Sequence, residues 1–194
     1  MVEQIKKKAK EENVPIMQDD GIKFLTDYIK NNSVKQILEI GTAVGYSAIC
    51  MASVSKDIKV VSIERDEERY LEAVENVKKM NLENQITLIY KDALEVELDE
   101  KFDLIFIDAA KGKNIEFFEK FEKNLKKNGT IITDNINFHG FTEMPLEEIK
   151  SKNLRSLIKK IRKYITYLKE NETYQTIFYD IGDGVSVTTR KEDR

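Results

Sequence analysis

Cysteine and histidine are nearly missing from this chain of 194 residues, which has one of each, Cys50 and His139. A single cysteine excludes a disulfide within the chain and a zinc site built from several thiolates. A single histidine excludes a metal site with several imidazole ligands, and a Ser-His-Asp triad would have to use His139. Any bound metal is therefore expected to have oxygen ligands, which favours hard cations such as Mg²⁺.

Long hydrophobic runs are also missing, since no apolar stretch approaches the ~20 residues that span a bilayer. Residues 1–13 are rich in Lys and Glu and contain no apolar segment of the kind found in secretory signals. The chain is 41% hydrophobic and 35% charged, with a net charge of −3, as is typical of soluble globular proteins. We therefore expect one cytoplasmic domain over residues 1–194, without membrane contact and with N-terminal helices in about residues 1–31.

The middle of the chain alternates short apolar runs with amphipathic segments. Strands are predicted at 35–40, 58–63, 85–90, 102–107 and 130–133. Helices are predicted at 20–30, 46–53, 66–80 and 114–125, the last of them capped by Gly129. This alternation predicts a parallel sheet that is covered by helices on both faces.

The C-terminal part has a different pattern. A long helix is predicted over 145–170, followed by strands at 174–181 and 185–190 around Gly182-Asp183-Gly184. The expected fold is therefore a doubly wound, Rossmann-like α/β sheet that ends in an antiparallel hairpin.

Acidic residues lie at or just after the ends of all five predicted parallel strands. They are Glu39, Glu64, Asp92, Asp108 and Asp134. Ligands of doubly wound sheets bind outside this edge. A single acid here could be a helix cap or a turn residue, but five at one edge favour a binding site.

The segment E-I-G-T-A-V-G-Y-S, residues 39–47, connects the first predicted strand to its helix. Its glycines allow a tight turn and a close approach of the backbone to a ligand. It is not the dinucleotide fingerprint G-x-G-x-x-G, because Ala43 occupies a required glycine position. Glu64, 19 residues after Gly45, ends the second strand, where an acid accepts hydrogen bonds from ribose hydroxyls. Asp92 and Ala93, after the third strand, are placed to border an adenine ring.

Two neighbouring strands end in possible metal ligands. L-I-F-I-D ends on Asp108, and T-I-I-T-D-N ends on Asp134 and Asn135. Two carboxylates and one amide oxygen form an incomplete oxygen shell that suits Mg²⁺ and leaves positions open for substrate oxygens.

Together these motifs resemble the metal-dependent S-adenosylmethionine O-methyltransferases, which include catechol and caffeoyl-CoA O-methyltransferases. The resemblance rests on residues 39–47, Glu64, Asp92-Ala93, I-D-A-A-K at 107–111 and T-D-N at 133–135. It runs from about Val14 to the hairpin and implies the class I methyltransferase fold and a homodimer. Within this family, the short chain and V-P-I-M at 14–17 are most similar to bacterial tRNA 5-hydroxyuridine methyltransferases.

The resemblance implies roles for residues around the cofactor. Glu39 would belong to the cofactor-binding residues, the loop after it would approach the methionine part at Gly41, and Ser47 would hold the methionine carboxylate. Glu64 would bind the ribose, Asp92 and Ala93 would contact the adenine, and Asp108 would lie at the reacting end. Met17 would close over the cofactor, although an ordinary core methionine is an equal alternative.

The resemblance also implies a mechanism. A cation held by Asp108, Asp134 and Asn135 would activate the acceptor hydroxyl, and Lys111 would remove its proton. Without the resemblance, Lys111 would be interpreted as a surface lysine. His139 could contact the substrate or be a simple loop residue.

The substrate is the least determined feature. Residues 150–169 contain eight basic and no acidic side chains, which suits phosphate contacts better than an ordinary solvated helix face. The preferred acceptor is 5-hydroxyuridine at the tRNA wobble position, giving 5-methoxyuridine, and the alternative is a small catechol-like phenol. An NAD-type redox protein and a catalytically silent RNA-binding module are disfavoured by Ala43 and by the metal-ligand set.

Overall fold

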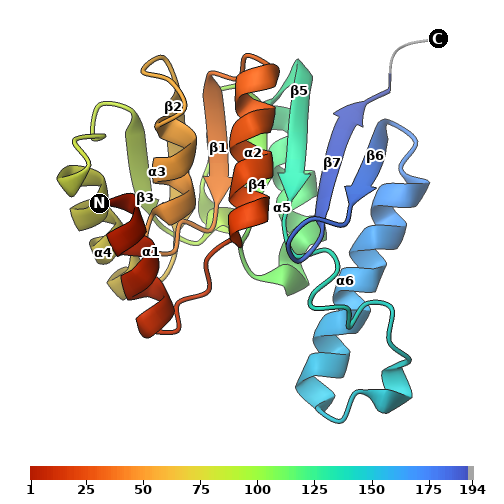
Figure 1. The fold of residues 1–194 in the computed structure, drawn as a ribbon. Helices are drawn as coiled ribbons and strands as arrows, with labels where there is room; N and C mark the ends of the chain where they lie inside the picture. Colours follow the sequence, from red (N-terminus) through yellow and green to blue (C-terminus); the bar gives the residue numbers. More distant parts are fainter. Residues whose placement is uncertain (192–194) are drawn as a thin grey trace.

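Seven strands form one sheet in the computed structural model, which describes residues 1–191 (Figure 1). The strands are β1 Gln36–Ile40, β2 Lys59–Glu64, β3 Ile86–Tyr90, β4 Phe102–Ile107, β5 Leu125–Thr133, β6 Tyr174–Tyr179 and β7 Val185–Arg190. Their order in the sheet is β3-β2-β1-β4-β5-β7-β6. Strands β1 to β5 are parallel, and β7 pairs antiparallel with both β5 and β6. The predicted doubly wound sheet with a C-terminal hairpin is confirmed.

Helices cover both faces of the sheet, which explains why its central strands are apolar on both sides. Helices α1 Val2–Glu11, α2 Asp19–Asn31, α3 Tyr46–Ala52 and α4 Glu67–Lys79 pack on one face. Helices α5 Asn114–Phe121 and α6 Lys152–Glu170 pack on the other face through aromatic residues such as Phe118 and Tyr164. Burial between these layers fixes the parallel strands in register, so that their carboxyl ends share one edge.

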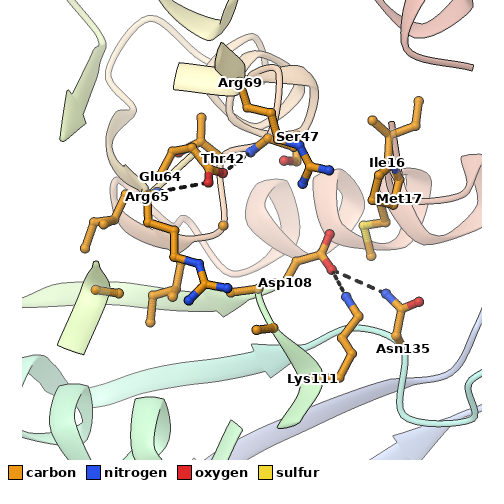
Figure 2. A pocket seen from close by; sticks show the side chains of 18 of the residues that line it. Ile16, Met17, Thr42, Ser47, Glu64, Arg65, Arg69, Asp108, Lys111 and Asn135 are labelled. Atoms are coloured by element: carbon orange, nitrogen blue, oxygen red, sulfur yellow. Dashed lines mark hydrogen bonds and ion pairs between the residues drawn. The ribbon is translucent and has the colours of Figure 1, made fainter. Parts of the chain in front are cut away.

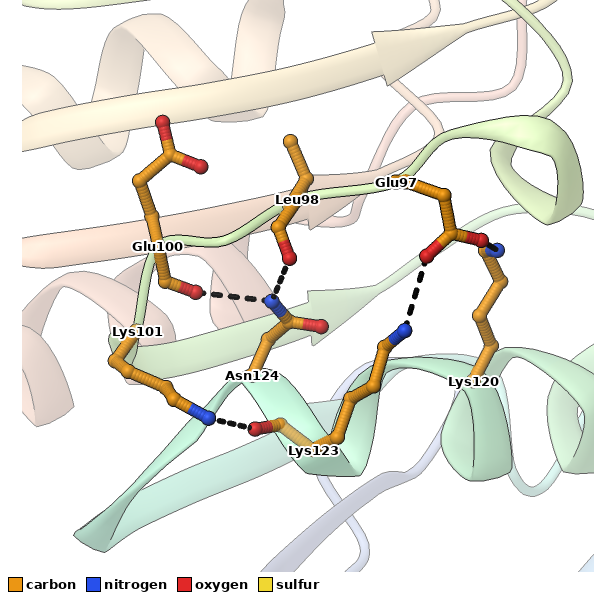
Figure 3. Close-up of polar contacts among 7 residues, drawn as sticks. All are labelled: Glu97, Leu98, Glu100, Lys101, Lys120, Lys123 and Asn124. Carbon is orange, nitrogen blue, oxygen red and sulfur yellow. Dashed lines mark hydrogen bonds and ion pairs between the residues drawn. The ribbon is translucent and has the colours of Figure 1, made fainter.

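The segment after α5 corrects one prediction. Gly129 does not cap a helix, because α5 ends at Phe121, a 3₁₀ turn covers Glu122–Asn124, and β5 already begins at Leu125. The Asn124 amide donates to the carbonyls of Leu98 and Glu100 at 2.8 and 2.9 Å and so ends the helix against the preceding loop (Figure 3). Gly129 lies within the strand, where a Cβ would come within 2.7 Å of the Leu125 side chain.

Ion pairs reinforce the same junction on its exposed side. Lys120 and Lys123 reach Glu97 at 2.7 and 2.9 Å, and Lys101 donates to the Lys123 carbonyl (Figure 3). These two lysines hold the pKa of Glu97 well below its usual range, at about 2. The Glu97 side chain is 70% exposed, so water screens both pairs and the contribution of each to stability is small.

The helix predicted over 145–170 is interrupted. A 3₁₀ turn at Leu146–Glu148 is followed by α6, which begins only at Lys152. Ser151 is its N-cap and accepts a hydrogen bond from the backbone N–H of Leu154 at 3.3 Å. The side chain of Ile149 is buried between the two segments, so the chain must bend there.

A membrane-crossing helix was not expected from the sequence. Among residues 1–191, none of the helices has both the length and the apolar character needed to cross a bilayer.

Candidate active site

A cavity of about 640 Å³ lies along the carboxyl ends of the parallel strands (Figure 2). Most of the predicted site residues line it, namely Met17, Gly41, Ser47, Glu64, Asp92, Ala93, Asp108, Lys111 and Asn135. Glu39 and Asp134 do not line it; they are buried behind its wall, with side chains almost fully shielded from solvent. The structure therefore brings most of the predicted set to one cavity, with Glu39 and Asp134 buried behind its lining and Asp134 hydrogen-bonded to the lining residue Asn135.

The loop after β1 requires glycine at Gly41. Its φ is +99°, and a Cβ there would come within 2.5 Å of the backbone oxygen of Asp108. Only glycine fits such a close approach of two strand ends. Gly41 therefore draws the β1 and β4 ends together, so that the cofactor loop and Asp108 border the same cavity.

Glu39 organises a buried hydrogen-bond network beneath this loop. Ser47 donates to one of its carboxyl oxygens at 2.5 Å, and Ser62 donates to the other. The hydroxyls of Ser62 and Thr42 are also paired, at 2.5 Å. Burial raises the pKa of Glu39 to about 8 despite these hydrogen bonds, and the charges of Asp108 and Glu64 add to the rise. Glu39 thus connects β1, β2 and the start of α3.

Glu64 holds two turns with its two carboxylate oxygens. One oxygen accepts the backbone N–H of Ala43 at 2.8 Å, and the other accepts those of Arg65 and Asp66, both at 2.9 Å. The side chain is buried on the cavity wall. Carboxylate oxygens have further lone pairs, so Glu64 is fixed in place and can still accept hydrogen bonds from a ligand.

Asp92 is held in a similar way at the end of β3. It accepts the backbone N–H of Leu94 at 3.0 Å, and Arg65 and Lys113 lie 3.5 and 3.7 Å from its other oxygen. The Leu94 N–H, followed by the charges of Lys113 and Arg65, lowers the pKa of Asp92. Ala93, the next residue, is buried on the cavity wall.

The predicted metal ligands meet at the ends of β4 and β5. The Asn135 amide nitrogen donates to Asp134 at 2.8 Å and to Asp108 at 3.3 Å. Lys111 lies 2.6 Å from the same Asp108 oxygen (Figure 2). Burial and the negative charge of Asp108 raise the pKa of Asp134 well above its usual range. Two carboxylates therefore share this corner with one ammonium group and one amide as their partners.

The loop after Asn135 is strained and braced by the hairpin. Asn135, Phe138 and His139 have φ values of +63°, +46° and +57°, in the left-handed region that non-glycine residues seldom occupy. The backbone oxygen of Asp183 accepts N–H groups from this loop at 2.8 and 3.2 Å. His139 Nδ1 lies 2.8 Å from the Asp183 carboxylate. The hairpin turn thus fixes the loop. His139 lines the cavity and is not one of the predicted metal ligands.

Met17 sits on the connector between α1 and α2. Its side chain is buried and packs so closely on α2 that a Cβ at Gly21 would come within 2.9 Å of its terminal methyl. The neighbouring Pro15, Ile16 and Gln18 also line the cavity. Met17 is therefore both a core residue and part of the cavity wall, so the two alternatives for it are compatible.

Several cavity-lining residues were not predicted, namely Thr42, Arg65, Arg69, Lys91, Phe117 and Asp183. Arg65 and Arg69 lie within five residues of Glu64, so proximity to a predicted ligand could have indicated them. Phe117 and Asp183 come from α5 and the hairpin turn, whose places in space were not readable from the strand ends.

Comparison with known proteins agrees with this arrangement. The model of the O-methyltransferase family matches residues 1–191. A caffeoyl-CoA O-methyltransferase of Populus kitakamiensis is 26% identical over 92% of this chain and 78% of its own. A flavonoid 3′,5′-methyltransferase of Vitis vinifera is 27% identical with the same coverage.

Solved structures are similar over nearly the whole chain. A proposed caffeoyl-CoA O-methyltransferase of Staphylococcus aureus has 38% identity and a TM-score of 0.93, covering 98% of this chain and 92% of its own. An O-methyltransferase of Bacillus cereus, solved in complex with SAH, has 26% identity and a TM-score of 0.83, covering 98% and 90%. The chain therefore belongs to the O-methyltransferase family and is an S-adenosylmethionine-dependent O-methyltransferase.

Proposed function

We propose that this enzyme transfers the methyl group of S-adenosylmethionine to a hydroxyl held beside Asp108, and that the preferred acceptor is 5-hydroxyuridine at the tRNA wobble position. The donor would lie along the cavity from β3 to β4. Asp92 and Ala93 would contact the adenine, Glu64 the ribose hydroxyls, and Gly41 the methionine part. This order is supported by the shared cavity and by the fixed carboxylate of Glu64.

The corner at Asp108, Asp134 and Asn135 fits a hard divalent cation. Two carboxylates and one amide meet there, and oxygen ligands of these kinds are the ones that hard cations prefer. The described residues contain no cluster of three or more carboxylate, thiolate or imidazole groups for a metal, so in this proposal Asn135 would supply the third ligand. Its amide would have to turn its oxygen inward, an exchange of O and N that leaves the shape unchanged. A cation bound here would make the acceptor hydroxyl more acidic.

Lys111 is the proposed general base. It follows Asp108 by three residues, its side chain is only 19% exposed, and it reaches into the cavity (Figure 2). In its neutral form Lys111 would accept the proton of the acceptor hydroxyl while the methyl group is transferred. A group that accepts this proton must lie within hydrogen-bond reach of the acceptor oxygen, and the ion pair with Asp108 would hold the lysine beside the proposed acceptor position.

The observation that carries the tRNA assignment is the surface of α6. Lys159, Lys160 and Lys163 are exposed, and none of the three forms an ion pair with any residue in 1–191. Lys160 also lies against the segment that contains Lys111, since a Cβ at Gly112 would be 3.4 Å from its ammonium nitrogen. A surface of one sign that continues to the cavity suits the phosphates of a nucleic acid.

Arg162 does not belong to this surface. Its guanidinium donates to the backbone oxygens of Thr142, at 2.9 Å, and Met144. Arg155 similarly donates to the Ile149 oxygen at 2.6 Å. Both arginines hold the segment that precedes α6, so phosphate contacts are assigned to the lysines alone.

Methylation of a small catechol-like phenol is the second candidate. It is favoured by the similarity to the Populus and Vitis enzymes, whose names refer to caffeoyl-CoA and flavonoids. It needs the same donor and metal-ligand set and differs only in the acceptor.

The two candidates are separated by charge reversal on α6. Lys159→Glu, Lys160→Glu and Lys163→Glu together should raise the KM for tRNA and reduce the slope of log affinity against log salt by roughly 2–3, at about 0.7–0.9 per lost contact. The control reverses Lys30, Lys56 and Lys127, which are exposed at the opposite edge of the sheet and change the net charge equally. Mass spectrometry of tRNA nucleosides gives the product. Equal methylation of tRNA by both variants at every salt concentration would contradict the phosphate contacts of the α6 lysines. Absence of 5-methoxyuridine after incubation of tRNA with the wild-type enzyme, S-adenosylmethionine and Mg²⁺ would contradict the tRNA assignment.

A further inference from the structure

The side chain of Arg69 lines the cavity, but none of the proposed contacts to the donor or to the metal involves it. Arg69 lies in the first turn of α4, where its backbone N–H is capped by Asp66 at 3.0 Å. In Figure 2 the guanidinium points toward Ser47 and toward the side of the cavity where Ile16 and Met17 lie. The side chain is half-buried. The start of α4 therefore places a permanent positive charge at the Ser47 end of the cavity.

The other basic groups that line the cavity have partners or lie elsewhere. Arg65 is 3.5 Å from Asp92, Lys111 is 2.6 Å from Asp108, and His139 is 2.8 Å from Asp183. Lys91 follows β3 and is exposed beside Asp92. Within residues 1–191, no carboxylate lies within ion-pair distance of the Arg69 guanidinium.

Ser47 alone is a poor partner for an anion. Its single hydroxyl hydrogen is donated to Glu39 at 2.5 Å, so its outward side offers only lone pairs. A carboxylate beside it would need a positive or N–H partner from elsewhere. Arginine is suited to this because its planar guanidinium can donate two parallel hydrogen bonds to one carboxylate.

We infer that Arg69 binds the methionine carboxylate of S-adenosylmethionine and supplies the charge that Ser47 cannot. This inference rests on the proposed orientation of the donor, with its adenine at Asp92 and its methionine part at Ser47. Arg69 would then fix the methionine end, while Glu64 fixes the ribose and the sulfonium methyl points toward Asp108.

The test compares two ligands that differ at this end. S-adenosylhomocysteine contains the amino-acid carboxylate, and 5′-methylthioadenosine lacks the whole amino-acid group but retains the adenine, ribose and thioether. Dissociation constants of both ligands are measured by calorimetry for the wild-type protein and for Arg69→Ala and Arg69→Lys. Losing a hydrogen-bonded charge pair should weaken S-adenosylhomocysteine roughly 10- to 100-fold in Arg69→Ala, with little change for methylthioadenosine. Arg69→Lys keeps the charge and should be intermediate.

Arg65→Ala is the matched control, since Arg65 lies just before the same helix but pairs with Asp92 at the proposed adenine end. It should leave the ratio of the two dissociation constants unchanged. Equal weakening of both ligands in a folded Arg69→Ala protein, or a changed acceptor KM with unchanged S-adenosylhomocysteine affinity, would overturn the inference alone. If the wild-type protein bound neither ligand, both the Arg69 inference and the proposed donor site would be wrong.

Discussion

The carboxylates at the carboxyl edge of the parallel sheet have different partners in its two halves. In the cofactor half, at the ends of β1 to β3, Glu64 and Asp92 are held by backbone N–H groups and Glu39 by hydroxyls. In the acceptor half, at the ends of β4 and β5, Asp108 and Asp134 share one lysine and one amide. The first half is complete within the protein, and the second has more negative charge than its own partners balance. The excess negative charge is the reason why we propose that a further cation binds in the acceptor half.

The largest effect is expected at Asp134. Asp134→Asn should lower kcat by on the order of 10³-fold, since a bound cation contributes several kcal/mol to transition-state stabilisation. The fold should survive, because burial already disfavours the charged carboxylate at this position. Steady-state kinetics at saturating donor gives kcat, and calorimetry with S-adenosylhomocysteine serves as the control and should show nearly unchanged affinity. A variant that kept its turnover would remove the acceptor half from the mechanism.

The second largest effect is expected at Lys111. Lys111→Met should lower kcat by about 10²–10³-fold, which is within the usual contribution of a general base. Lys111→Arg is the informative companion, because it can keep the ion pair with Asp108 but cannot lose its proton. Single-turnover rates of both variants should fall together. An active Lys111→Arg enzyme would show that only the positive charge matters.

In the cofactor half, Glu64→Gln should weaken donor binding by about 1–3 kcal/mol, because a charged acceptor of hydrogen bonds becomes a neutral amide. The shape is retained, but one side-chain oxygen that accepts N–H groups from Ala43, Arg65 or Asp66 becomes a donor. Calorimetry measures the change, and kcat at saturating donor should move much less than in the Asp134 variant. Unchanged affinity in a folded variant would refute the ribose assignment.

The last prediction concerns Glu39 and the stability of the fold rather than catalysis. The pKa of Glu39 is raised from 4.5 to about 8 in the folded protein, so the folded state holds a proton that the unfolded state has lost at these pH values. The contribution of Glu39 to the free energy of unfolding is therefore full below pH 4.5 and declines as the pH rises to about 8. Denaturant unfolding across this range should show a weaker decline in Glu39→Gln. Parallel curves for the two proteins would mean that Glu39 titrates normally.

Much of the fold could be predicted from the spacing of apolar residues, and so could several residues at the carboxyl edge of the sheet. Apolar runs of strand length, each followed by an acid, were enough to place Glu64, Asp92 and Asp108 at one cavity, because parallel strands end at one edge. Positions decided by long-range packing could not be predicted. Gly129 was assigned to a helix cap, whereas Asn124 ends that segment through bonds to the distant loop at 98–100.

The same limit applies inside the site. The sequence pattern indicates that Ser47 follows the glycine loop, but not that Glu39 takes its hydroxyl hydrogen. It shows that Arg162 is one of eight basic residues in 150–169, but not that its guanidinium donates hydrogen bonds to the backbone oxygens of Thr142 and Met144. Hydrogen bonds between residues far apart in the chain leave no periodic signal, so these assignments required the structure.

The most direct test of the difference between the two halves is a paired measurement in the presence and absence of a chelator. Methyl transfer and S-adenosylhomocysteine affinity are measured on the same metal-stripped protein, before and after addition of Mg²⁺. Chelation should abolish methyl transfer and Mg²⁺ should restore it, while the affinity for S-adenosylhomocysteine changes little, because the carboxylates of the cofactor half are held by protein groups alone. Full transfer in excess chelator would contradict this prediction.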